Sequence, residues 1–259
     1  MDRAQSQLGQ AAVEAALTMP LMLFMVLGTM QLFMMLQGRL MAEHAAYKAV
    51  RVGVVNHGDC QRMTHAAVAA LLPSFFTYLG PNTPGGSPAE KYARAWRART
   101  VGKPFDNAFD GPPDANHTRA IVWLIRERPT IGEVTPQAED QFDDPGPRNN
   151  GEIGYRLELR LIYWYPLRIP FANWVMSAMY RAYFGLENYT YVNPLMTPQT
   201  ANWRRESSNT LSAAVRAELD LRHSLEQYSF PITATYTMRM MTPPRPRYFT
   251  RQNCQPAPP

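Results

Sequence analysis

Near its N-terminus the sequence reads AALTMPLMLFMVLGTMQLFMMLQG (residues 15–38), a run of 24 residues without a charged side chain. As a helix rising 1.5 Å per residue it would be about 36 Å long, enough to cross a hydrocarbon core of roughly 30 Å. The run is too long for the apolar region of a signal peptide, and no small-residue cleavage site follows it. The alternative is a buried helix of a soluble core, but such helices seldom extend so far without a polar face. We therefore predict a membrane span.

The composition of the whole chain excludes several classes of function. The 259 residues are 46% hydrophobic and 18% charged, which suits one or two folded domains. The net charge of +5 is spread along the chain without a basic run, so we expect no nucleic-acid partner. With two cysteines, Cys60 and Cys254, a disulfide-dense scaffold and a four-thiolate metal site are excluded. Nothing in the sequence predicts a metal or another cofactor.

A glutamate at the edge of the apolar run is the next informative residue. A carboxylate costs roughly 2.5–3.5 kcal/mol at mid-bilayer on insertion scales and less near the edge, and such residues usually have a partner. The alternative is that Glu14 lies among the lipid headgroups and binds water. Gly9 precedes Glu14 by five residues, and Pro20 follows it by six.

The spacing of Gly9, Glu14 and Pro20 resembles the class III signal of TadE-like proteins, the pseudopilins of tight-adherence (Flp-type) pilus systems. The resemblance covers residues 9–55. It implies a leader over residues 1–9, removed by a prepilin peptidase between Gly9 and Gln10, and a membrane span over residues 10–38. It also implies that Glu14 pairs with the free amine of Gln10 on a neighbouring subunit, which offsets two charges in low dielectric. Pro20 would give the helix a flexible point, or would be a tolerated membrane proline.

The resemblance also implies a role, partners and a location. The chain would be a minor pilin, a membrane-anchored structural component of pilus assembly and not an enzyme. Its partners would be the peptidase, other pilins, the membrane platform of the pilus machine and lipid. It would cross the bacterial inner membrane once, with a cytoplasmic N-terminus and a periplasmic or pilus-associated C-terminal domain. The charge bias alone predicts the opposite orientation, because Arg39, Lys48 and Arg51 follow the span and only Arg3 precedes it.

The remaining residues predict an α+β fold, with helices packed on a small antiparallel sheet. The long helix continues to about Val55 and ends at Gly58, a second covers residues 60–79, and a third starts at a serine cap, Ser87, and runs to about residue 100. Apolar residues alternate over 121–126, 155–165 and 232–240, which indicates strands. Since strands and helices do not alternate in a repeat, the sheet is expected to be antiparallel. We predict a head over residues 39–242 and a proline-rich tail, residues 243–259, with no core of its own.

Residues 171–184, FANWVMSAMYRAYF, predict a helix that is apolar nearly all round. One interpretation buries this helix under the sheet. In the other, Trp174, Tyr180 and Tyr183 belong to a surface that docks on another subunit or rests at the membrane interface, where Trp and Tyr are favoured. The sequence leaves both open.

Two further hypotheses concern covalent and catalytic chemistry. A disulfide between Cys60 and Cys254 would close a loop of about 194 residues, worth at most about 5 kcal/mol on the chain-entropy model; the alternative is two free thiols. The competing function is a membrane-tethered periplasmic enzyme or ligand-binding domain, although the sequence has no common catalytic motif. It would need a pocket formed by His117, His223 and acidic residues of two loops: Asp106, Asp110, Asp114, Glu139, Asp140, Asp143 and Asp144.

Overall fold

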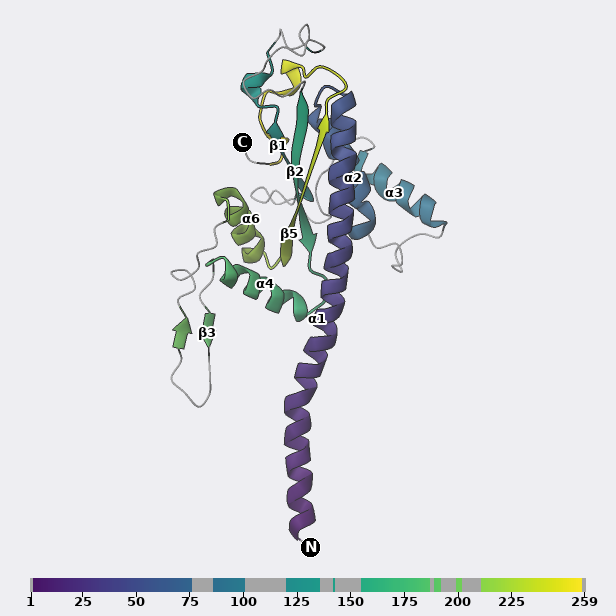
Figure 1. Ribbon diagram of the computed structural model, residues 1–259. Helices are drawn as coiled ribbons and strands as arrows, with labels where there is room; N and C mark the ends of the chain where they lie inside the picture. The colour runs from purple at the N-terminus through teal and green to yellow at the C-terminus, as the bar shows by residue number, and fades with distance from the viewer. Residues whose placement is uncertain are drawn as a thin grey trace. The chain divides into compact units, whose positions relative to one another are not determined.

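The computed structural model describes residues 2–75, 86–100, 120–135, 142, 155–186, 189–191, 199–201 and 211–257. Its helices are α1 (Asp2–Val55), α2 (Cys60–Phe75), α3 (Pro88–Thr100), α4 (Ala172–Tyr183) and α6 (Ala213–Ser224), with short 3-10 helices η1 (Ile131–Glu133) and η3 (Pro246–Tyr248). Its strands are β1 (Val122–Arg128), β2 (Arg156–Pro166), β3 (Tyr189–Tyr191), β4 (Gln199–Ala201) and β5 (Ser229–Arg239) (Figure 1). The predicted α+β class is confirmed.

The described chain forms two compact units. The first unit combines residues 1–36 with 166–229, and the second unit combines residues 37–165 with 230–259. The three-stranded sheet has the order β1-β2-β5. β1 and β2 are antiparallel, with Val122 opposite Tyr163 and Arg126 opposite Leu159. The predicted small antiparallel sheet is therefore confirmed.

The long first helix ends as its sequence predicts. His57 and Gly58 take positive φ angles of 57° and 80°, and the Gly58 N–H donates to the Gly53 carbonyl over 2.9 Å. This six-residue closure satisfies a carbonyl that the helix end would otherwise leave free. Pro20 lies inside α1, which stays helical on both sides of it. The third helix also starts as predicted, since the Glu90 N–H donates to Ser87 Oγ and the Ser87 N–H to Glu90 Oε2.

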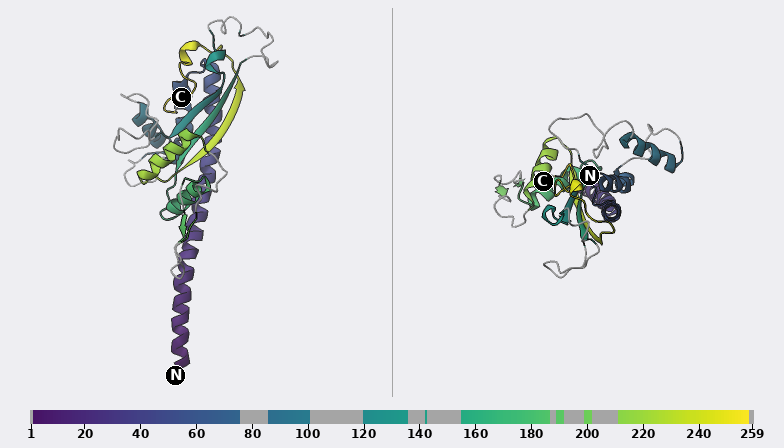
Figure 2. Two further views of the ribbon diagram at one scale, coloured as in Figure 1. Left: turned by 90° about the vertical axis from the view of Figure 1, so that its left-hand side faces the viewer. Right: turned by 90° about the horizontal axis from the view of Figure 1, so that it is seen from above.

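Small residues bring the C-terminal half of α1 against the sheet in the second unit (Figures 1 and 2). Gly38, Ala42, Ala45, Ala49 and Gly53 recur at spacings of three and four residues, and all are buried. A Cβ atom added at Gly38 would lie 2.7 Å from the ring of Tyr165, and one added at Gly53 would lie 2.5 Å from Leu157. The backbone of α1 therefore touches side chains of β2 at both ends of this stripe.

The C-terminal residues differ from the expectation of a tail without a core. Phe249, Cys254 and Ala257 are buried, and the Cys254 N–H donates to the carbonyl of Leu124 in β1 over 3.0 Å. The bridge between Leu124 and Cys254 is antiparallel. The physical reason is that polar groups of this segment find partners on β1, as the next subsection describes.

We expect Gly38→Leu to destabilise the packing of α1 on the sheet, because the Tyr165 ring leaves no space for a side chain there. Overpacking of this kind costs about 1–3 kcal/mol. The measurement is thermal unfolding of the full chain in detergent, followed by near-UV circular dichroism. Gly28→Leu is the matched control on the same helix, since nothing lies within 4 Å of a Cβ atom added at Gly28. Equal melting temperatures for the two variants would contradict the packing argument.

Candidate functional site

The residues of the predicted processing and assembly site lie in the N-terminal half of α1. The helix includes Gly9 and Gln10, and Glu14 is exposed. The hydroxyl of Thr18 donates to the main-chain carbonyl of Glu14 over 2.9 Å. The polar group of Thr18 is therefore satisfied within the helix. All the described side chains from Val13 to Leu23 are exposed.

An exposed apolar surface on every side of a helix needs lipid or other helices around it. The segment Val13–Val55 is long and apolar enough to cross a membrane, with a mean hydropathy of 1.9 in its most apolar window. Further along α1, the ring of Phe24 lies 5.9 Å from that of Phe171.

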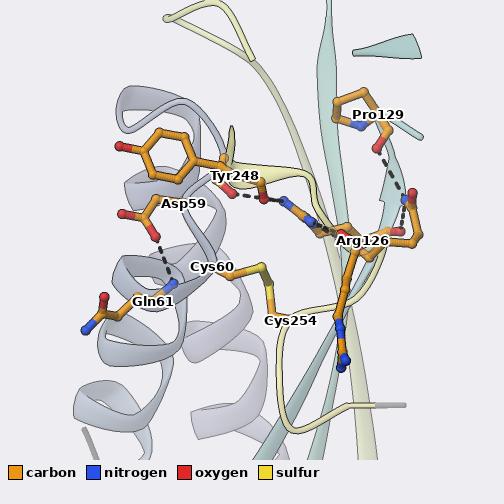
Figure 3. The surroundings of a disulfide bond; sticks show 10 residues. Asp59, Cys60, Gln61, Arg126, Pro129, Tyr248 and Cys254 are labelled. Carbon is orange, nitrogen blue, oxygen red and sulfur yellow. Dashed lines mark hydrogen bonds between the residues drawn. A yellow bond between two sulfur atoms is a disulfide. The ribbon is translucent and has the colours of Figure 1, made fainter. Parts of the chain in front are cut away.

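A second cluster of polar residues surrounds a disulfide in the second unit. Cys60, the first residue of α2, is bonded to Cys254, and their Cα atoms are 5.2 Å apart (Figure 3). The bond joins positions 194 residues apart in the sequence. It ties the start of α2 to the C-terminal segment beside β1.

Arg126 of β1 is the charged centre of this cluster, and it is 1% exposed. Its Nε donates to the Gln252 carbonyl over 2.8 Å, and its Nη1 donates to the carbonyls of Gly58 and Tyr248, each over 3.0 Å. Its Nη2 donates to the Arg251 carbonyl. The guanidinium therefore bonds the end of α1 and the C-terminal segment to one strand (Figure 3). We call Arg126 and these four carbonyls the Arg126 cluster.

The charge of Arg126 survives its burial. Desolvation lowers the pKa of Arg126 to about 10, and the carboxylate of Asp59 acts in the opposite direction. At neutral pH the group is still protonated and keeps its five N–H donors. The ring of Phe249 lies 4.0 Å below the guanidinium carbon and adds a cation–π contact. The arrangement is suited to holding chain segments together, since the acceptors are main-chain carbonyls.

Gln252 completes the attachment of the C-terminal segment to β1. Its amide Nε2 donates to the Arg126 carbonyl over 2.6 Å, and its Oε1 accepts from the Ile131 N–H over 3.0 Å. Sequence reasoning missed the role of Arg126. The available signal was its place in the alternating pattern of residues 121–126, where it falls on the same side of the strand as Val122 and Leu124.

The predicted docking residues on α4 are not equivalent. Trp174 and Tyr183 are 53% and 56% exposed, whereas Tyr180 is half-buried, and this burial raises its pKa to about 12. The buried positions of α4 are taken by small residues, Ala172, Ser177 and Ala182, together with Arg181, which pairs with Asp220 over 3.3 Å. Trp174 and Tyr183 are therefore not buried under the sheet, unlike the small residues of the same helix.

The residues of the alternative catalytic pocket are mostly beyond what the structure describes. His117 and the acidic residues of both loops lie outside the described residues. His223, near the end of α6, packs its ring against Tyr228. Within the described part of the chain, no three His, Cys, Asp or Glu side chains form a group that could hold a metal ion. A shallow depression on the sheet contains Glu127 and Glu158, and Glu127 pairs with Arg160 over 2.8 Å.

Replacing Arg126 tests whether the cluster stabilises the fold. We expect Arg126→Met to lower the free energy of unfolding by about 3 kcal/mol or more, because each buried acceptor left without a donor costs about 1–3 kcal/mol. The measurement is urea unfolding of the full chain in detergent. Arg160→Met is the matched control on the neighbouring strand, since exposed ion pairs contribute only about 0–1 kcal/mol. A loss no larger than that of the control would refute the stabilising role.

Comparison with known protein families gives a match near the N-terminus. Residues 9–51 match the family model described as TadE-like protein. No curated protein and no solved structure matches the chain. The matched segment contains Gly9, Gln10, Glu14 and Pro20 and ends within the stripe that packs on the sheet. The resemblance predicted from this spacing is confirmed: the N-terminal segment, residues 9–51, is similar to TadE-like proteins.

Proposed function

We propose that this chain is a minor pilin of a tight-adherence pilus system, a structural component whose helix α1 anchors it in the inner membrane. The observation that carries the proposal is the TadE-like match over residues 9–51 on a helix that is long and apolar enough to cross a membrane. In this role the protein acts through packing and assembly. Its partners are a prepilin peptidase, other pilins and the membrane platform of the pilus machine.

Maturation removes the leader by cutting after Gly9. A peptidase site takes its substrate as an extended chain, so α1 has to open around residues 9 and 10, which are helical in the full-length chain. Glycine makes that opening easier, because it is about 1 kcal/mol less favourable than alanine inside a helix. The missing side chain also lets the backbone approach the peptidase closely. The product is a helix that starts with the free amine of Gln10.

Glu14 then directs assembly. A carboxylate within the membrane is costly unless it has a partner of opposite charge. The amine of Gln10 on a neighbouring subunit supplies that charge, and low dielectric strengthens the attraction. Pairing sets the axial register between neighbouring helices, while the exposed apolar side chains around Glu14 supply the rest of the contact.

The head faces the periplasm in this proposal, against the charge bias around the span. The bond between Cys60 and Cys254 supports that side of the membrane, because disulfides form and persist in the oxidising periplasm and are rare in the cytoplasm. The Arg126 cluster and the disulfide together hold the segment from Tyr248 to Cys254 of the exported head against its neighbours.

Processing is tested with Gly9→Val in cells that contain the peptidase. We expect the variant to keep its full-length mass, because a branched side chain obstructs the cleavage site, while the wild-type chain loses nine residues. Intact-mass measurement of protein extracted from membranes gives the result. Gly28→Val, a substitution in the same helix far from the cleavage site, should be cut like the wild type. Cleavage of Gly9→Val at the wild-type rate would exclude the proposed cleavage site.

Assembly is tested with Glu14→Val. We expect normal cleavage but loss of at least about 90% of the protein from sheared pilus or crosslinked pilin fractions, since about 1.4 kcal/mol of lost pairing already gives a tenfold change. Glu43→Val is the control, because Glu43 is an exposed acid on the same helix beyond the apolar run, paired with Arg39. If Glu14→Val assembles as well as Glu43→Val, the pairing hypothesis is wrong although the membrane anchor stands.

A further inference from the structure

Within the first unit, the segment that precedes α4 contacts α1 inside its uncharged run. Gln31, buried within this run, accepts a hydrogen bond at Oε1 from the Ile169 N–H over 3.0 Å. Two residues later, the ring of Phe171 meets that of Phe24 edge to face, with centroids 5.9 Å apart. The short segment that leads into α4 is therefore attached to α1 at Gln31 and Phe24, well before the end of the uncharged run at residue 38.

The depth of this attachment follows from helix geometry and rests on the proposed function, in which Gln10 is the mature N-terminus at one membrane surface. Gln31 lies 21 residues further on, which is about 32 Å along a helix. That is close to the roughly 30 Å thickness of the hydrocarbon core. Gln31 and Ile169 then lie at the opposite edge of the core, and Phe24, seven residues before Gln31, lies about 10 Å inside that edge.

Backbone polarity at this depth is accommodated by the sequence. A main-chain N–H at the edge of the hydrocarbon needs a partner, because water is scarce there. The Gln31 side chain supplies one for Ile169, and the next residue, Pro170, has no N–H. The Asn173 N–H, in the first turn of α4, donates to the Ile169 carbonyl over 2.9 Å. The side-chain oxygen of Gln31 thus has a structural role in the uncharged run.

The surface of α4 is unusual for a helix that faces water. Four large apolar or aromatic side chains on or next to it, Phe171, Trp174, Met179 and Tyr183, are each more than half exposed. The charged residue of the helix, Arg181, is buried and paired with Asp220 instead. In Figure 1, α4 begins beside α1 and leads away from it. We call Phe171, Trp174, Met179 and Tyr183 the α4 surface.

We propose that the α4 surface inserts into the headgroup–acyl boundary of the outer leaflet, so that the first unit rests on the bilayer as well as being anchored by α1. Lipid is the occupant because the surface is continuous with the exposed apolar side chains of α1 through the contact between Phe24 and Phe171. Trp and Tyr are favoured at this boundary, and interfacial helices bury their apolar side about 5–10 Å deep.

The test measures how deep four positions lie in the lipid, with one labelled position in each variant. The full-length protein is placed in nanodiscs that each hold a single copy. Both native cysteines are bonded to each other, so each introduced cysteine is the one site for a nitroxide label. Trp174→Cys and Met179→Cys report on the α4 surface. Met22→Cys, at a position 72% exposed, reports on the span, and Met241→Cys, at a position 67% exposed in the second unit, is the aqueous control. Collision rates with oxygen and with a polar nickel chelate give the depth.

At positions 174 and 179 we expect the collision rate of the label with oxygen to exceed its collision rate with the nickel chelate severalfold. The ratio of the two rates should lie between the ratio measured at position 22 and the ratio measured at position 241. The inference is overturned if the oxygen-to-nickel ratios at positions 174 and 179 equal the ratio at position 241 while position 22 lies deep in lipid. The membrane anchor would still stand. Low collision rates with both reagents at 174 and 179 would also overturn it, because protein would then cover the surface. A polar environment at position 22 would refute the membrane span itself, and with it the proposed function.

Discussion

The exposed apolar circumference at the start of α1 is the constraint on which the other features depend. From Val13 to Leu23 every described side chain is exposed. Contact of such a large apolar surface with water is unfavourable in free energy. Lipid or neighbouring helices must cover it. Further along the same helix the environment changes, because Gly38, Ala42 and Gly53 let the backbone approach the protein's own sheet. One continuous helix thus combines a segment that needs an apolar environment outside the chain with a segment whose environment is the fold itself.

The second unit holds its ends together with one buried charge and one covalent bond. Arg126 is bonded to four main-chain carbonyls from two separate segments, and the disulfide joins the same two parts of the chain. A buried charge is costly unless its hydrogen bonds are satisfied. Here the guanidinium donates to the main-chain carbonyls of two segments. These hydrogen bonds offset the cost of burying the charge and the cost of burying the carbonyl groups. The C-terminal segment is therefore held on the sheet by both kinds of bond.

Local signals in the sequence were sufficient for much of the fold. Period-two alternation predicted the three main strands, Gly58 marked the end of α1, and the serine–glutamate pair at Ser87 marked the start of α3, because each depends on neighbours within a few residues. Arg126 was missed, since its partners lie more than 60 residues away in sequence. The packing of the C-terminal segment was missed for the same reason. Its proline-rich sequence has no periodic pattern, and its partners on β1 are distant in the sequence. The exposure of Trp174 was left open, because an apolar helix has the same sequence pattern whether protein or lipid covers it.

The decisive measurement is the identity of the N-terminal residue in wild-type protein extracted from its own membranes. If the proposed function holds, the chain starts at Gln10 and leaves the membrane only in detergent, because a trimmed apolar helix anchors and aligns the subunit. A chain that retains its initiating methionine and stays in the aqueous fraction after cell lysis is neither a processed pilin nor anchored in the membrane.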